Sequence, residues 1–328
     1  MDSKINHIIL DLYDEAQHCP ISEFASRSLS KLQKLLKFDS AGIASFAAAA
    51  DGTINANAAY VFNQPIEKIT YRQSNIPTGL LKNDGNIISR DPMIAACWQE
   101  RGRSKYTSLV DMTADEDLKN YNKKFDTIQI MTIALKNAQP DKADYISLWR
   151  AGSKNYFEEK DARLGDLLLP HLNKAIEINK KIIDPLSAGV VVIFCSPHGF
   201  IHFTDNAILK ILQEEWSEWT PPILPQQFIH DLVYTAGHQY IGKSITARAE
   251  INGNLVVIKV AFNPIGKLLT PSELKVALCI ADGMSYKEAA RILGISPATV
   301  RNQLHSVYKK TGQSGRSELA KLLNRQSF

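Results

Sequence analysis

The sequence predicts an α+β protein of several domains, in which antiparallel sheets with helices precede an all-helical C-terminal module. Three observations carry this prediction. The 328 residues are enough for two or three domains of ordinary size. Helix and strand patterns alternate through most of the chain, whereas its last part contains only helix signals. The charge divides in the same way, because residues 266–328 carry +6 and the rest of the chain sums to −2.

The composition is that of a globular protein, with 45% hydrophobic and 22% charged residues. The small apolar run at 41–50 is far shorter than the roughly 20 residues that span a bilayer, and the N-terminus lacks a signal-peptide pattern. We therefore expect a cytoplasmic protein without a membrane segment. The four cysteines are scattered, which argues against a disulfide framework or a zinc site. No metal or cofactor is expected.

Helices followed by antiparallel strands are predicted for the first part of the chain. Ile5, Ile8, Ile9 and Leu12 recur at helical spacing and predict an opening helix. Asp91 precedes Pro92, which is the arrangement of a helix cap followed by proline in the first turn. The other expected elements are a helix at 21–37, strands at 40–49 and 53–62 around an Asp-Gly turn, a helix at 90–102, strands at 126–137 and 143–152, and a long helix at 156–182.

This order of elements, and above all the closing "LLPHLNKA" helix, resembles a GAF-like sensor domain, which we assign to 1–184. Strand patterns at 188–204, a helix beginning near Asp205 and paired strands around "NGN" resemble a PAS-like unit at 185–264, although an elaborated linker also fits. Neither a Walker loop nor the paired acids of a phosphorylated receiver are found.

A curved antiparallel sheet covered by helices can enclose a small molecule. The residues predicted to line such a pocket, which could equally be ordinary core residues, are Phe46, Tyr60, Tyr71, Trp98, Ile128, Ile130 and Trp149. Asp91 and Pro92 match a dipeptide of the acyl-homoserine-lactone receptors. Their W-x-x-x-Y signature is missing around 55–75, which argues against that ligand.

Four short helices are predicted after residue 265. The first starts at "LTPSE", where Thr270 caps the helix and Glu273 completes a capping box, and the second repeats this pattern at "SYKE". The third, opened by Ser296 and Pro297, carries two faces. Val300, Leu304 and Val307 fall on one side, and a polar set falls on another: Arg301, Asn302, His305 and Lys309.

The stretch from Leu269 to Leu323 resembles the helix-turn-helix domain of LuxR/FixJ-type (GerE-like) transcription regulators, which we assign to 265–328. The resemblance implies an all-α four-helix fold whose third helix enters the major groove, with dimers reading paired half-sites. Base reading is implied for Arg301, Asn302 and His305. Backbone contacts are implied for Lys287, Ser296, Thr299, Lys309 and Lys310, and dimer contacts for Leu319, Leu322 and Leu323.

The expected function is therefore that of a ligand-responsive bacterial transcription regulator, with double-stranded DNA, a small-molecule effector, a second copy of the chain and RNA polymerase as partners. An alternative is that the N-terminal region binds another protein and contains no ligand pocket. An enzyme is not expected, because no Ser-His-Asp, HExxH or paired-carboxylate spacing stands out.

Overall fold

The computed structural model of the chain describes residues 2–48, 51–76, 79–108, 111, 115–135, 141–151, 156–183, 190–204, 206–235, 237–263, 265–266 and 268–324. These residues fall into two compact units, the first formed by 1–185 with 201–203 and the second by 186–200 with 204–328. The predicted boundaries at 184/185 and 264/265, and the predicted helix start at Asp205, involve residues outside the described ranges. These boundaries stay predictions.

The first unit is built on an antiparallel sheet, which confirms the mixed α/β prediction for this part of the chain. In the described residues its strand order is β2-β1-β7-β6-β5. Ala44 of β1 pairs with Ala59 of β2 and Tyr145 of β7, so the two predicted hairpin strands meet around the Asp-Gly turn. The strands are β1 Ser40–Ala48, β2 Ile54–Phe62, β5 Ser104–Ser108, β6 Gln129–Leu135 and β7 Lys142–Arg150.

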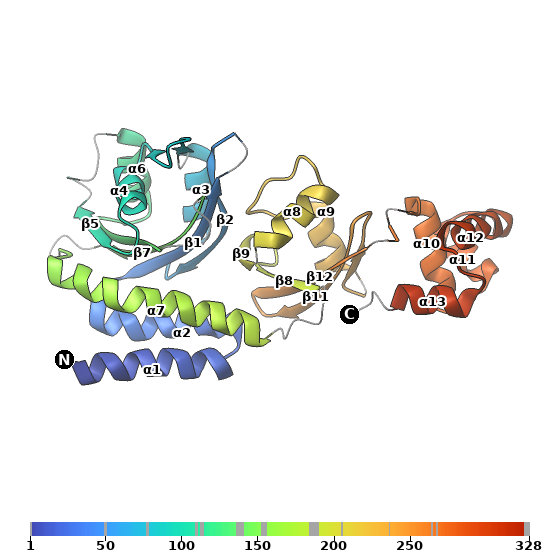
Figure 1. The fold of residues 1–328 in the computed structure, drawn as a ribbon, viewed down its shortest axis with the longest axis horizontal. Coiled ribbons are helices and arrows are strands. Elements are labelled where there is room, and N and C mark those ends of the chain that lie inside the picture. Colours follow the sequence, from blue (N-terminus) through green and yellow to red (C-terminus); the bar gives the residue numbers. More distant parts are fainter. Residues whose placement is uncertain are drawn as a thin grey trace. The chain divides into compact units, whose positions relative to one another are not determined.

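Helices cover both faces of this sheet (Figure 1). One face is covered by α1 Asp2–His18, α2 Ile21–Leu36 and α7 Glu159–Ile183, which pack against one another. The opposite face is covered by α3 Glu67–Asn75, α4 Pro92–Gln99 and α6 Glu116–Lys124, and β3 Leu80–Leu81 pairs with β4 Ile87–Ile88 nearby. As predicted, Asp91 caps α4, because its carboxylate accepts from the amides of Met93 and Ile94.

A second antiparallel sheet follows, with the strand order β10-β11-β12-β8-β9 in the described residues. The predicted strands around "NGN" form the hairpin of β11 and β12, in which Asn252 pairs with Leu255. The elements of this part are β8 Val190–Cys195, β9 Ile201–Thr204, α8 Asn206–Glu215, α9 Gln226–Ile229, the π-helical turn η1 His230–Tyr234, β10 Gln239–Ile241, β11 Ile245–Asn252 and β12 Leu255–Phe262.

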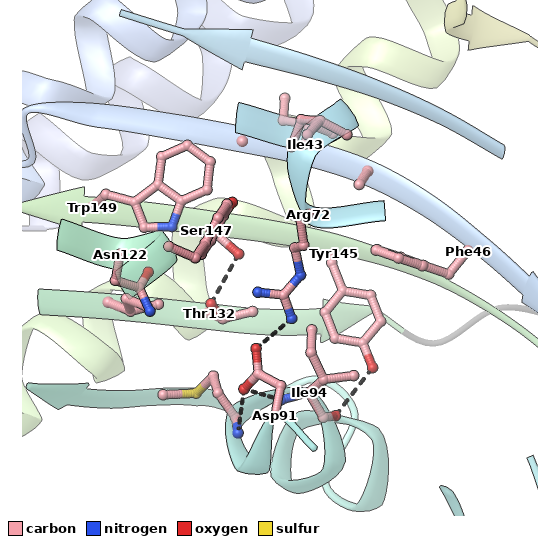
Figure 2. A pocket seen from close by; sticks show the side chains of 16 residues that line it. Ile43, Phe46, Arg72, Asp91, Ile94, Asn122, Thr132, Tyr145, Ser147 and Trp149 are labelled. Atoms are coloured by element: carbon pink, nitrogen blue, oxygen red, sulfur yellow. Dashed lines mark hydrogen bonds and ion pairs between the residues drawn. The ribbon is translucent and has the colours of Figure 1, made fainter. Parts of the chain in front are cut away.

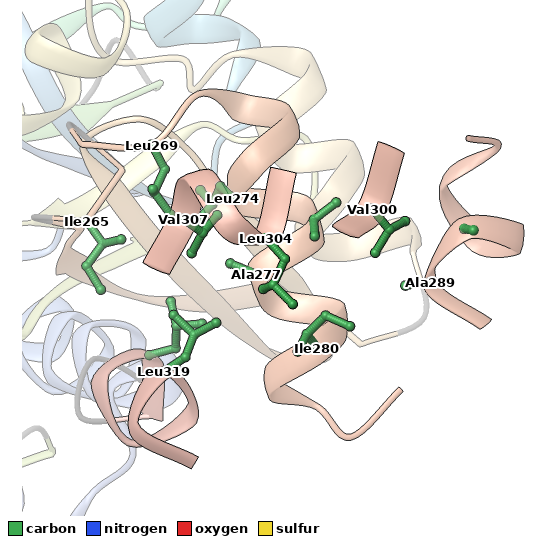
Figure 3. Packing of buried hydrophobic residues seen from close by; sticks show 13 residues of the cluster. Ile265, Leu269, Leu274, Ala277, Ile280, Ala289, Val300, Leu304, Val307 and Leu319 are labelled. Carbon is green, nitrogen blue, oxygen red and sulfur yellow. The ribbon is translucent and has the colours of Figure 1, made fainter. Parts of the chain in front are cut away.

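The last part of the chain consists of helices α10 Pro271–Ala281, α11 Tyr286–Leu293, α12 Pro297–Thr311 and α13 Arg316–Asn324. Both predicted capping boxes are present, since Thr270 with Glu273 and Ser285 with Glu288 exchange side-chain and backbone hydrogen bonds. The core that joins the helices includes Leu274, Val276, Ala277, Ile280, Ala289, Val300, Leu304, Val307 and Leu319 (Figure 3). No helix in the described ranges combines the length and the apolar character needed to cross a membrane.

Candidate functional site

Helix α12 has two faces of opposite character. Val300 and Val307 are fully buried and Leu304 is nearly so, and all three pack into the C-terminal helical core (Figure 3). Arg301, the residue after Val300, is exposed. This arrangement follows from helical geometry, because positions three and four residues apart share a face while their neighbours point elsewhere.

The residues predicted to read bases all lie on the exposed part of α12. Arg301, Asn302 and His305 are solvent-exposed, and their side chains make no hydrogen bond or ion pair within the described chain. Such side chains remain available to a partner. Arginine can donate two parallel hydrogen bonds to guanine, and asparagine can pair with the major-groove edge of adenine.

The residues predicted to contact the DNA backbone have different roles in the fold. Lys287 and Lys309 are exposed. Ser296 caps α12, since its hydroxyl accepts from the amide of Thr299 at 3.0 Å and lies 2.8 Å from the Thr299 hydroxyl. Lys310 donates to a carboxylate oxygen of Glu273 at 2.7 Å. A phosphate contact by Lys310 would therefore compete with an ion pair that the fold already makes.

Glu273 connects the first helix of the module to α12. One carboxylate oxygen accepts from the hydroxyl of Ser306 at 2.6 Å, and the other accepts from Lys310 and from the amide of Thr270, each at 2.7 Å. Burial raises the pKa of this carboxyl, but the hydrogen bonds from Lys310, Ser306 and Thr270 outweigh it and hold the pKa at about 2. The orientation of α12 is thus fixed by a charged network as well as by its apolar face.

The predicted dimer contacts on α13 stay predictions, and the structure shows where their three side chains lie within one chain. Leu319 is fully buried and Leu323 is 8% exposed, and both belong to the core of the helical module. Leu322 is partly buried and packs against the same core. Within one chain, the apolar spacing of α13 therefore packs this helix onto the core of the helical module.

The first unit contains a cavity between its sheet and the helices α3, α4 and α6 (Figure 2). Its volume is about 70 Å³. The wall on the sheet side comes from β1, β6 and β7, which contribute aromatic, aliphatic and hydroxyl side chains. The residues that line the cavity include Phe46, Arg72, Asp91, Tyr145, Thr132, Ser147 and Trp149.

Polar groups in the cavity wall are paired with one another (Figure 2). The guanidinium of Arg72 lies 2.5 Å from a carboxylate oxygen of Asp91. Burial opposes the charge of Arg72, but Asp91 and Tyr121 outweigh it and raise the pKa of the guanidinium. On the sheet, the hydroxyls of Thr132 and Ser147 lie 2.9 Å apart. The charges of Arg72 and Asp91 therefore offset each other.

A buried lysine stands behind one wall of the cavity. Lys68 is 1% exposed, donates to the hydroxyl of Thr127 at 2.5 Å, and places its ammonium nitrogen 3.6 Å from the ring centroid of Trp149. Burial, assisted by the nearby charge of Arg72, lowers the pKa of Lys68 to about 7. Neutral and charged forms of this amine are therefore both present near neutral pH.

Three of the seven residues predicted to line a pocket do so: Phe46, Ile130 and Trp149. The other four lie outside the lining of this cavity. Tyr71 stacks on Tyr121, the indole of Trp98 donates to the carbonyl of Gly85 at 3.3 Å, and Ile128 and Tyr60 are partly buried. A pattern of large apolar residues does not distinguish cavity walls from core, because both are apolar.

Sequence reasoning missed the helix that supplies the charged groups. Helix α3 carries Lys68 and Arg72 one turn apart, yet its sequence, EKITYRQSN, is polar and lacks a clear apolar stripe. A weak signal was present, since two cations four residues apart on a helix share one face. The sequence alone does not say that this face is buried.

Comparisons with known proteins agree with the C-terminal geometry. The family described as "Bacterial regulatory proteins, luxR family" (GerE) matches residues 267–323. No curated protein matches the chain.

Among solved structures, the N-acylhomoserine lactone dependent LuxR family transcription factor CepR2 from Burkholderia cenocepacia is 13% identical, with a TM-score of 0.39 over 55% of this chain and 99% of that one. Escherichia coli SdiA is 12% identical, with a TM-score of 0.39 over 99% and 97% of the two chains. A phycoerythrobilin-bound GAF domain of a cyanobacterial phytochrome is 9% identical, with a TM-score of 0.35 over 53% and 95%. Similarities with TM-scores this low do not define the role of the first unit. The matched segment, the four observed helices and both capping boxes together identify residues 267–323 as a domain of the LuxR family of bacterial regulatory proteins.

Proposed function

We propose that this chain is a bacterial transcription regulator that binds double-stranded DNA as a homodimer and responds to a small molecule held by its N-terminal unit. The observation that carries the proposal is the division of α12, whose apolar face is buried while Arg301, Asn302 and His305 are exposed and unpaired in the described chain. The protein works in the cytoplasm and acts on RNA polymerase at a promoter. It has no catalytic step.

Two kinds of contact follow from the chemistry of this face. Arg301, Asn302 and His305 read base edges in the major groove, because no other part of the described chain occupies their donors and acceptors. Lys287 and Lys309, with Ser296 and Thr299 at the entry of the helix, approach phosphates, which position the module without reading sequence. The cavity beside Arg72 and Trp149 supports the sensing role, because it lies between three helices and the sheet.

Base reading is tested with an operator selected from random DNA. We expect Arg301→Ala to weaken operator binding and to relax the preference at one base position, by about 1–3 kcal/mol of discrimination, with little change in thermal stability. Fluorescence anisotropy with the operator and single-base variants measures both. Unchanged affinity and unchanged base preference in this variant would show that the exposed face of α12 does not read DNA.

Phosphate contact is tested with the same DNA. We expect Lys309→Ala to weaken binding to all sequences similarly and to reduce the slope of log affinity against log salt by about 1. Lys275→Ala is the matched control, since Lys275 is an exposed lysine on α10 and lies outside α12. Equal salt slopes for the two variants would place the DNA surface elsewhere.

A further inference from the structure

One cation and one carboxylate line the N-terminal cavity, and a second cation is buried against the ring of Trp149 in its wall. Lys68 and Arg72 lie one turn apart on α3, and Arg72 pairs with Asp91. One carboxylate oxygen of Asp91 faces Arg72, and the other accepts from the amide of Met93 at 2.9 Å and from that of Ile94 at 3.4 Å. Within the described chain no hydrogen bond or ion pair joins Asp91 to Lys68.

Lys68 has no carboxylate partner of its own in the described chain. Its contacts are the hydroxyl of Thr127 and the ring of Trp149, which lines the cavity. The acid that acts on it favourably is Asp126, which is exposed to solvent and therefore screened. A protonated Lys68 therefore adds one positive charge that no buried acid of the described chain neutralises. Burying a charge without an ionic partner is energetically unfavourable.

The other titratable side chains near Lys68 and the cavity do not supply a negative charge that would neutralise Lys68. Tyr121 of α6 and Tyr145 of β7 are neutral, since burial raises the pKa of Tyr121 to about 12 and raises that of Tyr145 further. Thr132 and Ser147 share one hydrogen bond, which uses one of their two hydroxyl protons. The remaining proton is a donor for an oxygen atom placed in the cavity.

The volume limits what can enter. At about 70 Å³ the cavity has roughly half the ~150 Å³ of an engineered cavity that holds benzene. A few heavy atoms fit this space, with an apolar end against Phe46 and Trp149. A long acyl chain does not fit it.

We propose that the cavity binds a short-chain monocarboxylate, whose negative charge balances protonated Lys68 and whose oxygens are held by Arg72 and by the hydroxyls of Thr132 and Ser147. This inference rests on the proposed sensing function and specifies its ligand class. It requires no covalent step. Binding takes up a proton whenever Lys68 is neutral in the free protein.

The proton linkage fixes the direction of the pH dependence. The pKa of Lys68 is lowered to about 7, so the free protein loses this charge as pH rises through 7, while a carboxylate ligand stays ionised. Affinity is therefore constant below about pH 7 and falls by about tenfold for each pH unit above it. Between about pH 7 and pH 9 the expected loss is about fiftyfold.

Propionate and propionamide form a matched pair of probes, because they share size and shape and differ in charge. We expect isothermal titration calorimetry of the full chain at about pH 6 to detect propionate binding and at least tenfold weaker binding of propionamide. At about pH 8, calorimetry in two buffers of different ionisation enthalpy should give close to one proton taken up per propionate. Equal binding of the two probes, or propionate binding without proton uptake, would overturn the proposal.

A variant pair tests Lys68 directly. Lys68→Met keeps the length of the side chain, and we expect it to weaken propionate binding at pH 6 by more than tenfold and to abolish the pH dependence. Lys124→Met is the control, because Lys124 also lies over an aromatic ring, 4.1 Å from the centroid of Tyr71, but is exposed and outside the cavity. Wild-type affinity in Lys68→Met would overturn the assignment, and the proton-uptake measurement decides the matter if this variant does not fold.

The outcomes separate this inference from the proposed function. Native mass spectrometry that finds a neutral or larger molecule retained by the chain, with no propionate binding, would reject the carboxylate class and leave ligand sensing in place. The test of base reading by the α12 face uses operator DNA and no propionate, so its result is independent of this inference.

Discussion

Glu273 shows at the residue scale how one buried carboxylate joins two helices. Its pKa is held at about 2, below the usual value of 4.5, so its ionised form is favoured in the folded state. The stability that this provides is fully present above about pH 4.5 and is lost as pH falls toward 2. We expect Glu273→Gln to lower the free energy of unfolding of the module by about 1–2 kcal/mol at pH 7, with a smaller difference near pH 3.

Hydrogen exchange of the α10 and α12 amides in the full chain measures this effect. Glu288→Gln is the control, because Glu288 completes a capping box in the same way but is exposed. Within the described residues its carboxylate makes no hydrogen bond to another helix. Equal loss of protection in the two variants would mean that the Lys310 and Ser306 contacts contribute nothing beyond the helix cap.

At the scale of the elements, the turn between α11 and α12 determines where α12 begins. Gly294 ends α11 in the left-handed region with φ of +66°, and no atom lies within 4 Å of the position a Cβ would take. We expect Gly294→Ala to destabilise the module by about 1–2 kcal/mol through backbone strain alone. Thermal unfolding measures this change. Gly315→Ala should have little effect, because Gly315 has equal space and no positive φ, and a similar loss in both variants would remove the strain explanation.

At the scale of the whole molecule, the burial of Leu319 in its own helical module bears on how two copies of the chain would associate. Because this side chain is fully buried in one chain's helical core, we expect Leu319→Ala to cost about 2–5 kcal/mol of folding stability. The loss should be the same at low and high protein concentration, since no subunit contact is removed. A melting temperature that recovers with concentration, together with dissociation in analytical ultracentrifugation, would place Leu319 in a dimer interface.

The sequence alone was sufficient to predict the C-terminal module. Capping boxes at Thr270 and Ser285, the glycine at 294 and the period of Val300, Leu304 and Val307 are local signals, and the structure confirms the helices that they predict. The exposed face of α12 follows from the same periodicity. Strands β1, β2, β6 and β7 were also found from alternation and turn residues, with ends that differ by a few residues.

Only the tertiary structure showed which side chains are buried at positions where the local sequence pattern does not predict burial. The helical spacing of Leu319 and Leu323 predicts an apolar face but not whether a neighbouring helix or a second chain covers it. Lys68 and Arg72 lie in a polar helix, and their burial depends on strands and helices that are distant in sequence. Cavities and charge balance arise from contacts between such distant segments, so the sequence determined the helices of the C-terminal module, and the tertiary structure decided which side chains line the cavity of the first unit.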